Sequence, residues 1–289
     1  MTPLAFTKMH GAGNDFVVLD GLRDELPPLE DLAAQVADRH TGVGFDQLLV
    51  VRESSSADFR MEIYNADGSQ VEMCANGIRA FFLYLREAGH TTAEEIRVET
   101  LSGIVVPRWA GEGRVTVDMG LPVLAPGKIP TTLGAAGSDG PVLDVPLDVD
   151  GRAFTVSSIS MGNPHCIVVV DDLDAFPVHE IGPQIEHHPA FPNRVNVEFI
   201  ELASRERIRQ RTWERGTGET LACGSGACAV AVSQMLRGVV DPSVTIELRG
   251  GELGILWGAE DQSVFMTGPA TTVYTGTLDL DALPRVPRS

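Results

Sequence analysis

Residues 221–236 read LACGSGACAVAVSQML, a cysteine in a glycine-rich turn followed by a run that is apolar nearly all round. The run Ala227–Leu236 predicts a helix, and a helix that is apolar on every side is expected to be buried. The same order recurs at residues 72–85, where EMCANG leads into a second run with apolar residues at helical spacing. Because Cys74 and Cys223 lie 149 positions apart, about half the chain, the repetition predicts two related lobes.

Short β-branched runs between glycine and proline residues predict strands through the rest of the chain. A third helix is predicted over 29–39, and a lobe boundary is expected near 119–122. Many strands around a few buried helices favour an α+β class over βαβ winding. The predicted strands are residues 16–19, 47–51, 97–100, 115–117, 166–170, 195–200, 244–248 and 264–267.

The composition excludes several classes of function. The 289 residues carry 22 Lys plus Arg against 40 Asp plus Glu, a formal net charge of −18. We therefore expect no nucleic-acid partner and no docking on anionic membranes. Lys8 and Lys128 are the two lysines, so a Schiff-base lysine for pyridoxal phosphate is improbable, and the sequence has no P-loop motif.

Neither a signal-peptide pattern nor an apolar run of about 18 residues occurs in the sequence. The four cysteines are therefore expected to be free thiols in a reducing cytoplasm. Cys166 and Cys228 lie in apolar runs and are predicted to be core residues. The five-residue spacing of Cys223 and Cys228 does not predict a zinc site, and we expect no metal.

The two cysteine turns have the features of a reactive site. A cysteine just before a helix meets unpaired backbone N–H groups and the positive end of the helix dipole, which predicts a lowered thiol pKa. Gly77, Gly224 and Gly226 would let backbone N–H groups approach a carboxylate closely. A single such cysteine is more often a buried structural residue, but two in matching contexts favour a function.

Two such sulfurs facing one carbon could invert a stereocentre. One thiolate would remove a proton, and the other thiol would deliver a proton to the opposite face. This needs two acid–base groups and donors that stabilise charge on the substrate carboxylate, but no cofactor.

The sequence resembles the diaminopimelate epimerase family from about residue 6 to about residue 280. The resemblance rests on motifs in a fixed order along the chain. They are KMHGAGNDF (8–16), RHTGVGFDQ (39–47), NADGS (65–69), MCANGIR (73–79), MGNPH (161–165), FPNRVNV (191–197), ERGTGET (214–220), ACGSG (222–226) and MTGPA (266–270).

The resemblance implies a cytoplasmic isomerase of lysine and peptidoglycan-precursor biosynthesis that interconverts LL- and meso-diaminopimelate, without cofactor or metal. It implies Cys223 as the base and Cys74 as the proton donor in the LL-to-meso direction. His165 and Glu214 match positions that tune the thiol pair. The substrate-binding positions it implies are Asn14, Gln47, Asn65, Ala75, Asn76, Asn163, Asn196, Glu214, Arg215, Gly224 and Ser225.

The resemblance also implies the architecture. Two similar lobes are expected, each a mostly antiparallel sheet or barrel round a central helix, with the active site in the cleft between them. Residues 1–120 would form the first lobe, which a strand within 276–289 would rejoin, and residues 121–275 the second. A homodimer is possible. Ala75 departs from the family's usual glycine, which an alanine can replace where φ is negative.

Two alternatives remain open at this stage. The first is a proline racemase-like or phenazine-pathway-like isomerase on the same scaffold, against which Asn76 and the Glu214–Arg215 pair argue. The second is a non-catalytic, two-lobed amino-acid binding protein, which would need no pair of reactive thiols.

Overall fold

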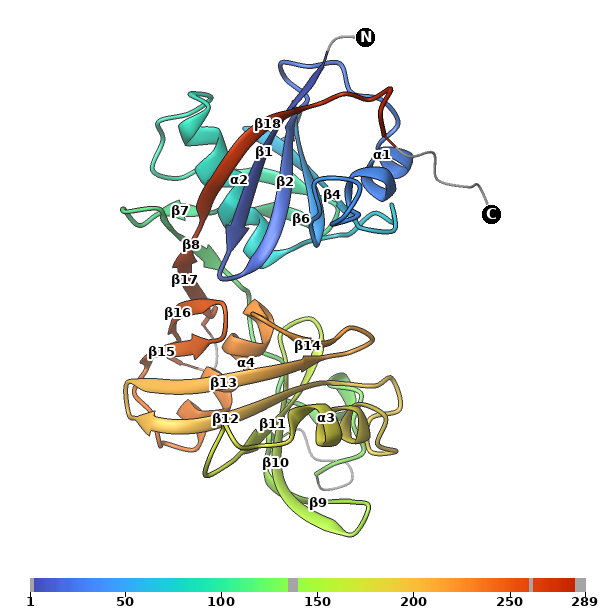
Figure 1. The fold of residues 1–289 in the computed structure, drawn as a ribbon. Helices are drawn as coiled ribbons and strands as arrows, with labels where there is room; N and C mark the ends of the chain where they lie inside the picture. Colours follow the sequence, from blue (N-terminus) through green and yellow to red (C-terminus); the bar gives the residue numbers. More distant parts are fainter. Residues whose placement is uncertain (1–2, 135–139, 260–261, 284–289) are drawn as a thin grey trace. The chain divides into compact units, whose positions relative to one another are not determined.

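The computed structural model describes residues 3–134, 140–259 and 262–283 (Figure 1). The chain divides into two compact units, Met1–Val117 with Gly268–Ser289, and Asp118–Thr267. Each unit combines a sheet with a buried helix, so the predicted α+β class is confirmed. The chain passes between the units within β8 (Arg114–Asp118) and again within β17 (Phe265–Pro269).

The first unit contains a seven-stranded sheet of order β18-β1-β2-β3-β4-β5-β6. The pairs β2·β3 and β4·β5 are parallel, and the others are antiparallel. The strands are β1 (Leu4–Gly11), β2 (Asn14–Asp20), β3 (Gln47–Arg52), β4 (Phe59–Asn65), β5 (Val98–Thr100), β6 (Gly103–Val105) and β18 (Thr271–Leu278).

The returning strand is β18, which pairs along β1 from Leu4 opposite Leu278 to His10 opposite Thr271 (Figure 1). It begins five residues before the expected segment 276–289, of which residues 284–289 lie outside the described structure. Residues from both ends of the sequence therefore build the same sheet.

Helix α2 (Ala75–Glu87) is the central helix of the first unit and contacts β1, β2, β3 and β18. Ile78, Phe81, Phe82 and Leu85, the residues at the predicted helical spacing, are fully buried. Gly89 follows the helix with φ +77°, a left-handed conformation that glycine adopts without strain.

Helix α1 (Leu29–Val36) is three residues shorter than predicted. The chain turns away because Gly42 and Asp38 close a backbone turn, and the Asp38 carboxylate accepts the N–H groups of His40 and Thr41. A short aspartate side chain thus competes with helix continuation.

The second unit contains the strand order β17-β16-β15-β13-β12-β11-β10-β9, with β14 paired to β13. The pairs β11·β12 and β13·β15 are parallel. The strands are β9 (Val142–Val149), β10 (Arg152–Ser160), β11 (Pro164–Val169), β12 (Asn196–Ser204), β13 (Arg207–Glu214), β14 (Gly218–Thr220), β15 (Ser243–Leu248) and β16 (Gly251–Leu256). The short strand β7 (Arg108–Trp109) pairs with β8.

Helix α4 (Gly224–Leu236) is the central helix of the second unit and packs on β10, β11, β12, β15 and β16. Its residues Ala227 to Val232 are fully buried, as its all-round apolar sequence predicts. A further helix, α3 (Val178–Glu186), was not predicted because Gly182 and Pro183 interrupt its pattern. Gly182 packs against Trp213 so closely that a Cβ would lie 2.6 Å from the ring.

The glycine- and alanine-rich composition of residues 131–141 predicts an exposed loop. Residues 131–134 and 140–141 have no helix or strand, and residues 135–139 lie outside the described structure. No helix in the described part of the chain is long and apolar enough to cross a membrane.

A half-buried ion network fixes the start of β2. Asp15 accepts from Lys8 Nζ at 2.5 Å and from Arg39 Nη1 at 2.8 Å, and Lys8 also donates to the Gly44 carbonyl. Two cations beside it lower the pKa of Asp15 well below its usual range, despite the opposing effect of burial. Since the folded pKa is depressed, this stabilisation is complete above the ordinary aspartate pKa of about 3.9 and is lost as the pH falls below it.

We predict that Asp15→Asn lowers the free energy of unfolding at pH 7 by about 3 kcal/mol, because it leaves the buried Lys8 ammonium without its counter-ion. Glu94→Gln, which removes an exposed ion pair with Arg86, should cost less than about 1 kcal/mol. Urea denaturation of both variants at pH 7 and pH 4 measures the difference between their free energies of unfolding. Equal stability of the two variants at pH 7 would contradict this interpretation.

Candidate active site

Both predicted cysteine turns are helix N-caps in which sulfur is the acceptor. Cys74 has extended backbone angles (φ −139°, ψ 115°), and its Sγ accepts the Gly77 N–H at 3.3 Å. Cys223 repeats the geometry (φ −123°, ψ 109°), and its Sγ accepts the Gly226 N–H at 3.4 Å. Each sulfur therefore lies at the positive end of a buried helix.

Ala75 fits its position without strain. It is the first residue of α2 and so has the negative φ of a helical residue. An alanine at this place keeps the backbone N–H groups of the first turn in helical geometry. The departure from the family's usual glycine is thus compatible with the expected carboxylate cradle.

In the first unit, asparagine side chains surround Cys74. Its Sγ lies 3.7 Å from Asn14 Oδ1, which also accepts from Asn76 Nδ2 at 3.4 Å. Asn76 is buried, and its Oδ1 accepts from the fully buried Arg79 at 2.8 Å. Asn14 is fixed in turn by Asp46, whose carboxylate accepts from Asn14 Nδ2 at 2.7 Å.

Gln47 and Asn65 lie opposite each other on β3 and β4. Gln47 Nε2 donates to Asn65 Oδ1 at 3.2 Å, and Asn65 Nδ2 donates to Ser69 at 3.1 Å. Gln47 Oε1 is buried and accepts no hydrogen bond from any described group. A buried acceptor without a donor is costly, so this oxygen is suited to a donor on a ligand.

In the second unit, His165 and Asn196 are neighbours on the parallel strands β11 and β12. Asn196 Nδ2 donates to the Pro164 carbonyl at 3.1 Å, and its Oδ1 accepts the Arg215 N–H at 2.9 Å. Asn163 Oδ1 lies 3.1 Å from His165 Nε2. These bonds tie the turn before β11 to the end of β13.

Glu214 is the last residue of β13, and Arg215 follows it. Glu214 is half-buried and accepts from Thr220 Oγ1 at 2.6 Å. Arg215 is exposed and donates one guanidinium N–H to the Asn193 carbonyl at 3.0 Å. A guanidinium with remaining donors can bind a carboxylate through two parallel hydrogen bonds.

A further charged residue, Glu198, was missed at the sequence level. It is fully buried on β12, and its Oε1 lies 2.8 Å from His165 Nδ1. Its Oε2 accepts from Gln210 Nε2 at 2.7 Å and from Thr212 Oγ1 at 2.6 Å. The carboxylate packs against Gly226, in the turn that holds Cys223.

One signal in the sequence could have revealed it. Glu198 lies two residues after Asn196 in the otherwise apolar run 195–200, so the two side chains share one face of the strand. A charge inside an apolar strand needs partners when it is buried. Those partners, however, come from two other strands, β11 and β13.

The thiol pKa of Cys223 differs from the sequence-based expectation. The helix N-terminus was predicted to lower it, but burial raises it well above its ordinary value, and the Glu214 and Glu198 charges act in the same direction. Hydrogen bonds from Ser225 and the Gly226 N–H oppose this effect only in part. The prediction of a lowered pKa is therefore wrong for Cys223.

Cys166 and Cys228 are fully buried, as predicted for core residues. Burial raises the pKa of the Cys166 thiol above its ordinary range. No disulfide involves any of the four cysteines.

Known proteins resemble this chain over nearly its whole length. The model of the diaminopimelate epimerase family matches residues 6–125 and 157–273. A diaminopimelate epimerase of Aromatoleum aromaticum is 50% identical over 280 residues, which cover 96% of this chain and 99% of that protein. The chain belongs to the diaminopimelate epimerase family. "Diaminopimelate epimerase 1" of a Nostoc species is 48% identical over 279 residues, 95% of this chain and 99% of that protein.

Solved structures outside this family share the fold. A phenazine biosynthesis protein of the PhzF family from Bacillus anthracis has a TM-score of 0.69 at 17% identity, covering 96% of this chain and 99% of that one. A probable proline racemase from Agrobacterium radiobacter has a TM-score of 0.67 at 15% identity, covering 96% and 93%. At these identities the likeness concerns the fold alone, so the epimerase family is favoured over both alternative isomerases.

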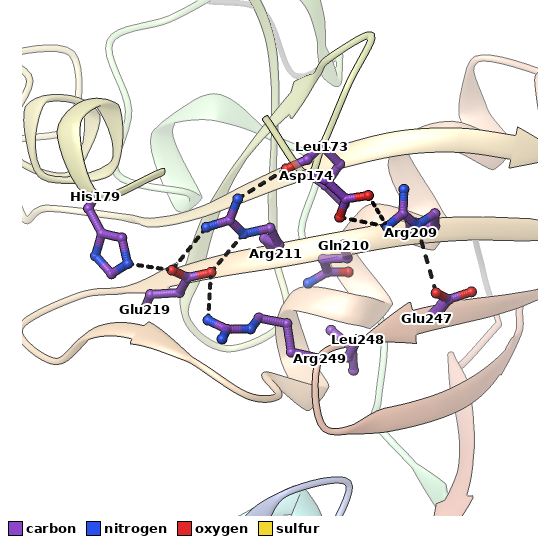
Figure 2. A pocket seen from close by; sticks show the side chains of 10 residues that line it. All are labelled: Leu173, Asp174, His179, Arg209, Gln210, Arg211, Glu219, Glu247, Leu248 and Arg249. Carbon is purple, nitrogen blue, oxygen red and sulfur yellow. Dashed lines mark hydrogen bonds and ion pairs between the residues drawn. The ribbon is translucent and has the colours of Figure 1, made fainter. Parts of the chain in front are cut away.

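A pocket of about 400 Å³ on the second unit is lined by none of the predicted site residues (Figure 2). Its arginines are already paired within the chain. Arg211 and Arg249 bind Glu219, and Arg209 binds Asp174 at 2.8 Å. The alternation of Arg207, Arg209 and Arg211 along β13 predicts a solvated face rather than an anion site, and these ion pairs agree with a structural role.

Gly226 is required by the buried carboxylate beside it. A Cβ at this position would overlap Glu198 Oε1. We predict that Gly226→Ala lowers the free energy of unfolding by about 1–3 kcal/mol, the range for overpacked cores. Gly127→Ala, where a Cβ would meet open space, is the matched control.

The double variant Gly226→Ala with Glu198→Ala should be less destabilised than the sum of the two single variants, because the second change removes the overlap. Denaturant unfolding of the four proteins measures this coupling. Additive losses would refute the contact.

Proposed function

We propose that the protein interconverts LL- and meso-2,6-diaminopimelate by inverting one α-carbon, with Cys74 and Cys223 as the two acid–base groups. The observation that carries the proposal is the pair of sulfur-capped buried helices, one in each unit, in a chain about half identical to diaminopimelate epimerases. The proposal requires the units to present the two sulfurs to opposite faces of one carbon.

The reaction then needs two proton transfers. The thiolate of Cys223 takes the α-proton as its C–H bond breaks, and the electron pair delocalises into the substrate carboxylate. The thiol of Cys74 gives its proton to the opposite face, which forms the new C–H bond. In the reverse direction the roles exchange, so each turnover leaves the two sulfurs with exchanged protonation states.

The charge that develops on the substrate carboxylate needs nearby donors. The first turns of α2 and α4 offer the backbone N–H groups of Ala75, Asn76, Gly224 and Ser225, at the positive ends of two helix dipoles. Donors that are fixed before the reaction stabilise this charge without reorganisation. No metal or pyridoxal phosphate is needed for this step.

The polar side chains suit a substrate with an amino-acid group at each end. Arg215 can bind the distal carboxylate in a two-bond fork, and Glu214 can bind an ammonium group. Asn163 and Asn196 offer further hydrogen bonds beside them. In the first unit, Gln47 is bonded to Asn65, and the unpartnered Gln47 Oε1 supports an ammonium donor there. A substrate without the second amino-acid group would leave such groups unpaired.

The basicity of Cys223 supports its assignment as a base. Burial and then the carboxylates of Glu214 and Glu198 raise the pKa of Cys223, so its thiolate is a strong base once the thiol has lost its proton. His165 acts on this site through Glu198 and Asn163. We propose His165 and Glu214 as residues that tune the thiol pair.

Two further properties are a reducing cellular location and assembly into a homodimer. Four free cysteines fit a reducing cytoplasm, the location we propose. A homodimer, which the family resemblance implies, stays a prediction.

We predict that the reduced protein, without added cofactor, exchanges the α-hydrogen of diaminopimelate with deuterium from D₂O, but not that of proline or lysine. Cys74→Ser and Cys223→Ser should each lower the epimerisation rate by roughly 10²–10⁴-fold, the contribution of one acid–base group. Cys228→Ala, which removes a thiol from the core of α4, is the matched control.

Mass spectrometry of the substrate measures exchange, and chiral chromatography measures inversion. Full turnover by either serine variant would overturn the two-cysteine assignment. Binding of diaminopimelate without exchange would instead favour the amino-acid binding protein.

A further inference from the structure

Three potential metal ligands of different chemistry meet beneath the turn of Cys223. One ligand atom each of Cys223, His165 and Glu198 lies within 4.8 Å of the other two. His165 and Glu198 are fully buried, and Cys223 is 6% exposed. They come from β11, β12 and the start of α4, so no spacing in the sequence could have revealed the cluster.

We propose that Cys223, His165 and Glu198 form an inhibitory binding site for Zn²⁺. Thiolate, imidazole and carboxylate are the three side-chain ligands that zinc prefers, and three protein ligands with one open position is its usual arrangement outside structural sites. Zinc–ligand bonds of about 2.0–2.3 Å require Nδ1 and Oε1, which lie 2.8 Å apart, to separate, and the Cys223 sulfur, within 4.8 Å of both, to move toward the ion.

The ligand atoms follow from the hydrogen bonds. His165 Nε2 faces Asn163 Oδ1 at 3.1 Å, which leaves Nδ1 for the cation. Glu198 Oε2 is held by Gln210 and Thr212, which leaves Oε1. Nδ1 and Oε1 lie 2.8 Å from each other, so both atoms face the place that the ion would take. Zinc would displace the thiol proton of Cys223, so binding of the ion releases a proton.

The supporting shell of such a site is already complete. In metal sites, a histidine ligand usually donates its second N–H to an oxygen, and a carboxylate ligand is itself hydrogen-bonded. Asn163 supplies the first of these partners, while Gln210 and Thr212 supply the second. The ligands are therefore oriented before any ion arrives.

The charge around the cluster also favours a cation. Glu198 and Glu214 both act on Cys223, and the cluster is buried, where an opposite charge is screened little. Ser225 Oγ lies 3.5 Å from the sulfur. The first unit offers a natural comparison, because no such ligand set occurs at Cys74 among the described residues.

Inhibition follows from the chemistry of the sulfur. Zinc would occupy the lone pair with which the Cys223 thiolate takes a proton, so proton transfer would stop until the ion is removed. The inhibition rests on the proposed function, whereas binding of the ion does not.

Cobalt(II) tests the site directly because its bond to a thiolate absorbs in the near ultraviolet. The reduced, chelator-stripped full-length protein is titrated with Co²⁺ and then with Zn²⁺. We expect one sulfur-to-cobalt band per chain, which Zn²⁺ removes. Cys223→Ser should lose the band, and Cys74→Ser should keep it.

Glu198→Gln tests the carboxylate ligand, and Thr212→Val tests the hydrogen bond that Thr212 donates to it. Circular dichroism verifies that both variants fold. Each should weaken Co²⁺ binding by at least about tenfold. Absence of the band in the unmodified protein, or its persistence in Cys223→Ser, would overturn the site.

The activity measurement separates the two proposals. Zn²⁺ should abolish α-hydrogen exchange on diaminopimelate, and EDTA should restore it. A cobalt band in a protein that does not epimerise would support the metal site and refute the proposed function. A band together with exchange that Zn²⁺ leaves unchanged would refute the inhibitory role.

Discussion

A cysteine sulfur accepts the backbone N–H at the first turn of a buried helix, and it does so once in each unit. This cap fixes the position of the sulfur, since the helix behind it is packed on all sides by its own sheet. It also leaves the other N–H groups of the turn available to an anion. The reactive atom and the carboxylate donors are thus consequences of one local geometry, and the residues around the two turns adapt it to their separate roles.

The two turns differ in the charge that lies behind them. Arg79, fully buried in α2, donates to the Ala75 carbonyl and to Asn76 Oδ1 in the first turn of the helix. Behind Cys223 lies the fully buried Glu198 instead. A buried cation and a buried anion therefore mark two otherwise similar sites. The two sulfurs therefore belong to turns with different buried charges behind them.

The sequence was informative where neighbouring residues determine the structure. The two caps, the burial of α2 and α4, the core cysteines and the negative φ of Ala75 all depend on residues a few positions apart. It was less informative where distant strands meet. Glu198 obtains its partners from β11 and β13, and the Lys8–Asp15–Arg39 network joins two strands and a loop. Helix α3 was not predicted because Gly182 interrupts its pattern. The reason for a glycine there is its close contact with Trp213, which is distant in the sequence.

The direction of the Cys223 pKa shift also depends on residues that are distant in the sequence. A helix N-terminus is visible in the sequence, but the carboxylates of Glu198 and Glu214 reach the sulfur only through the fold, and burial outweighs the dipole. The lobes, the caps and the family could therefore be predicted, whereas the electrostatics of the base required coordinates.

The most direct measurement of the central claim is the pairing of the two sulfurs in solution. The reduced full-length protein is treated with a mild oxidant, and its disulfides are mapped by mass spectrometry of unreduced peptides. A disulfide requires the two Cα atoms to come within about 7 Å of each other. The account predicts a Cys74–Cys223 disulfide that abolishes epimerisation and is reversed by a reductant. Oxidised protein in which both residues remain free thiols and activity is unchanged would contradict it.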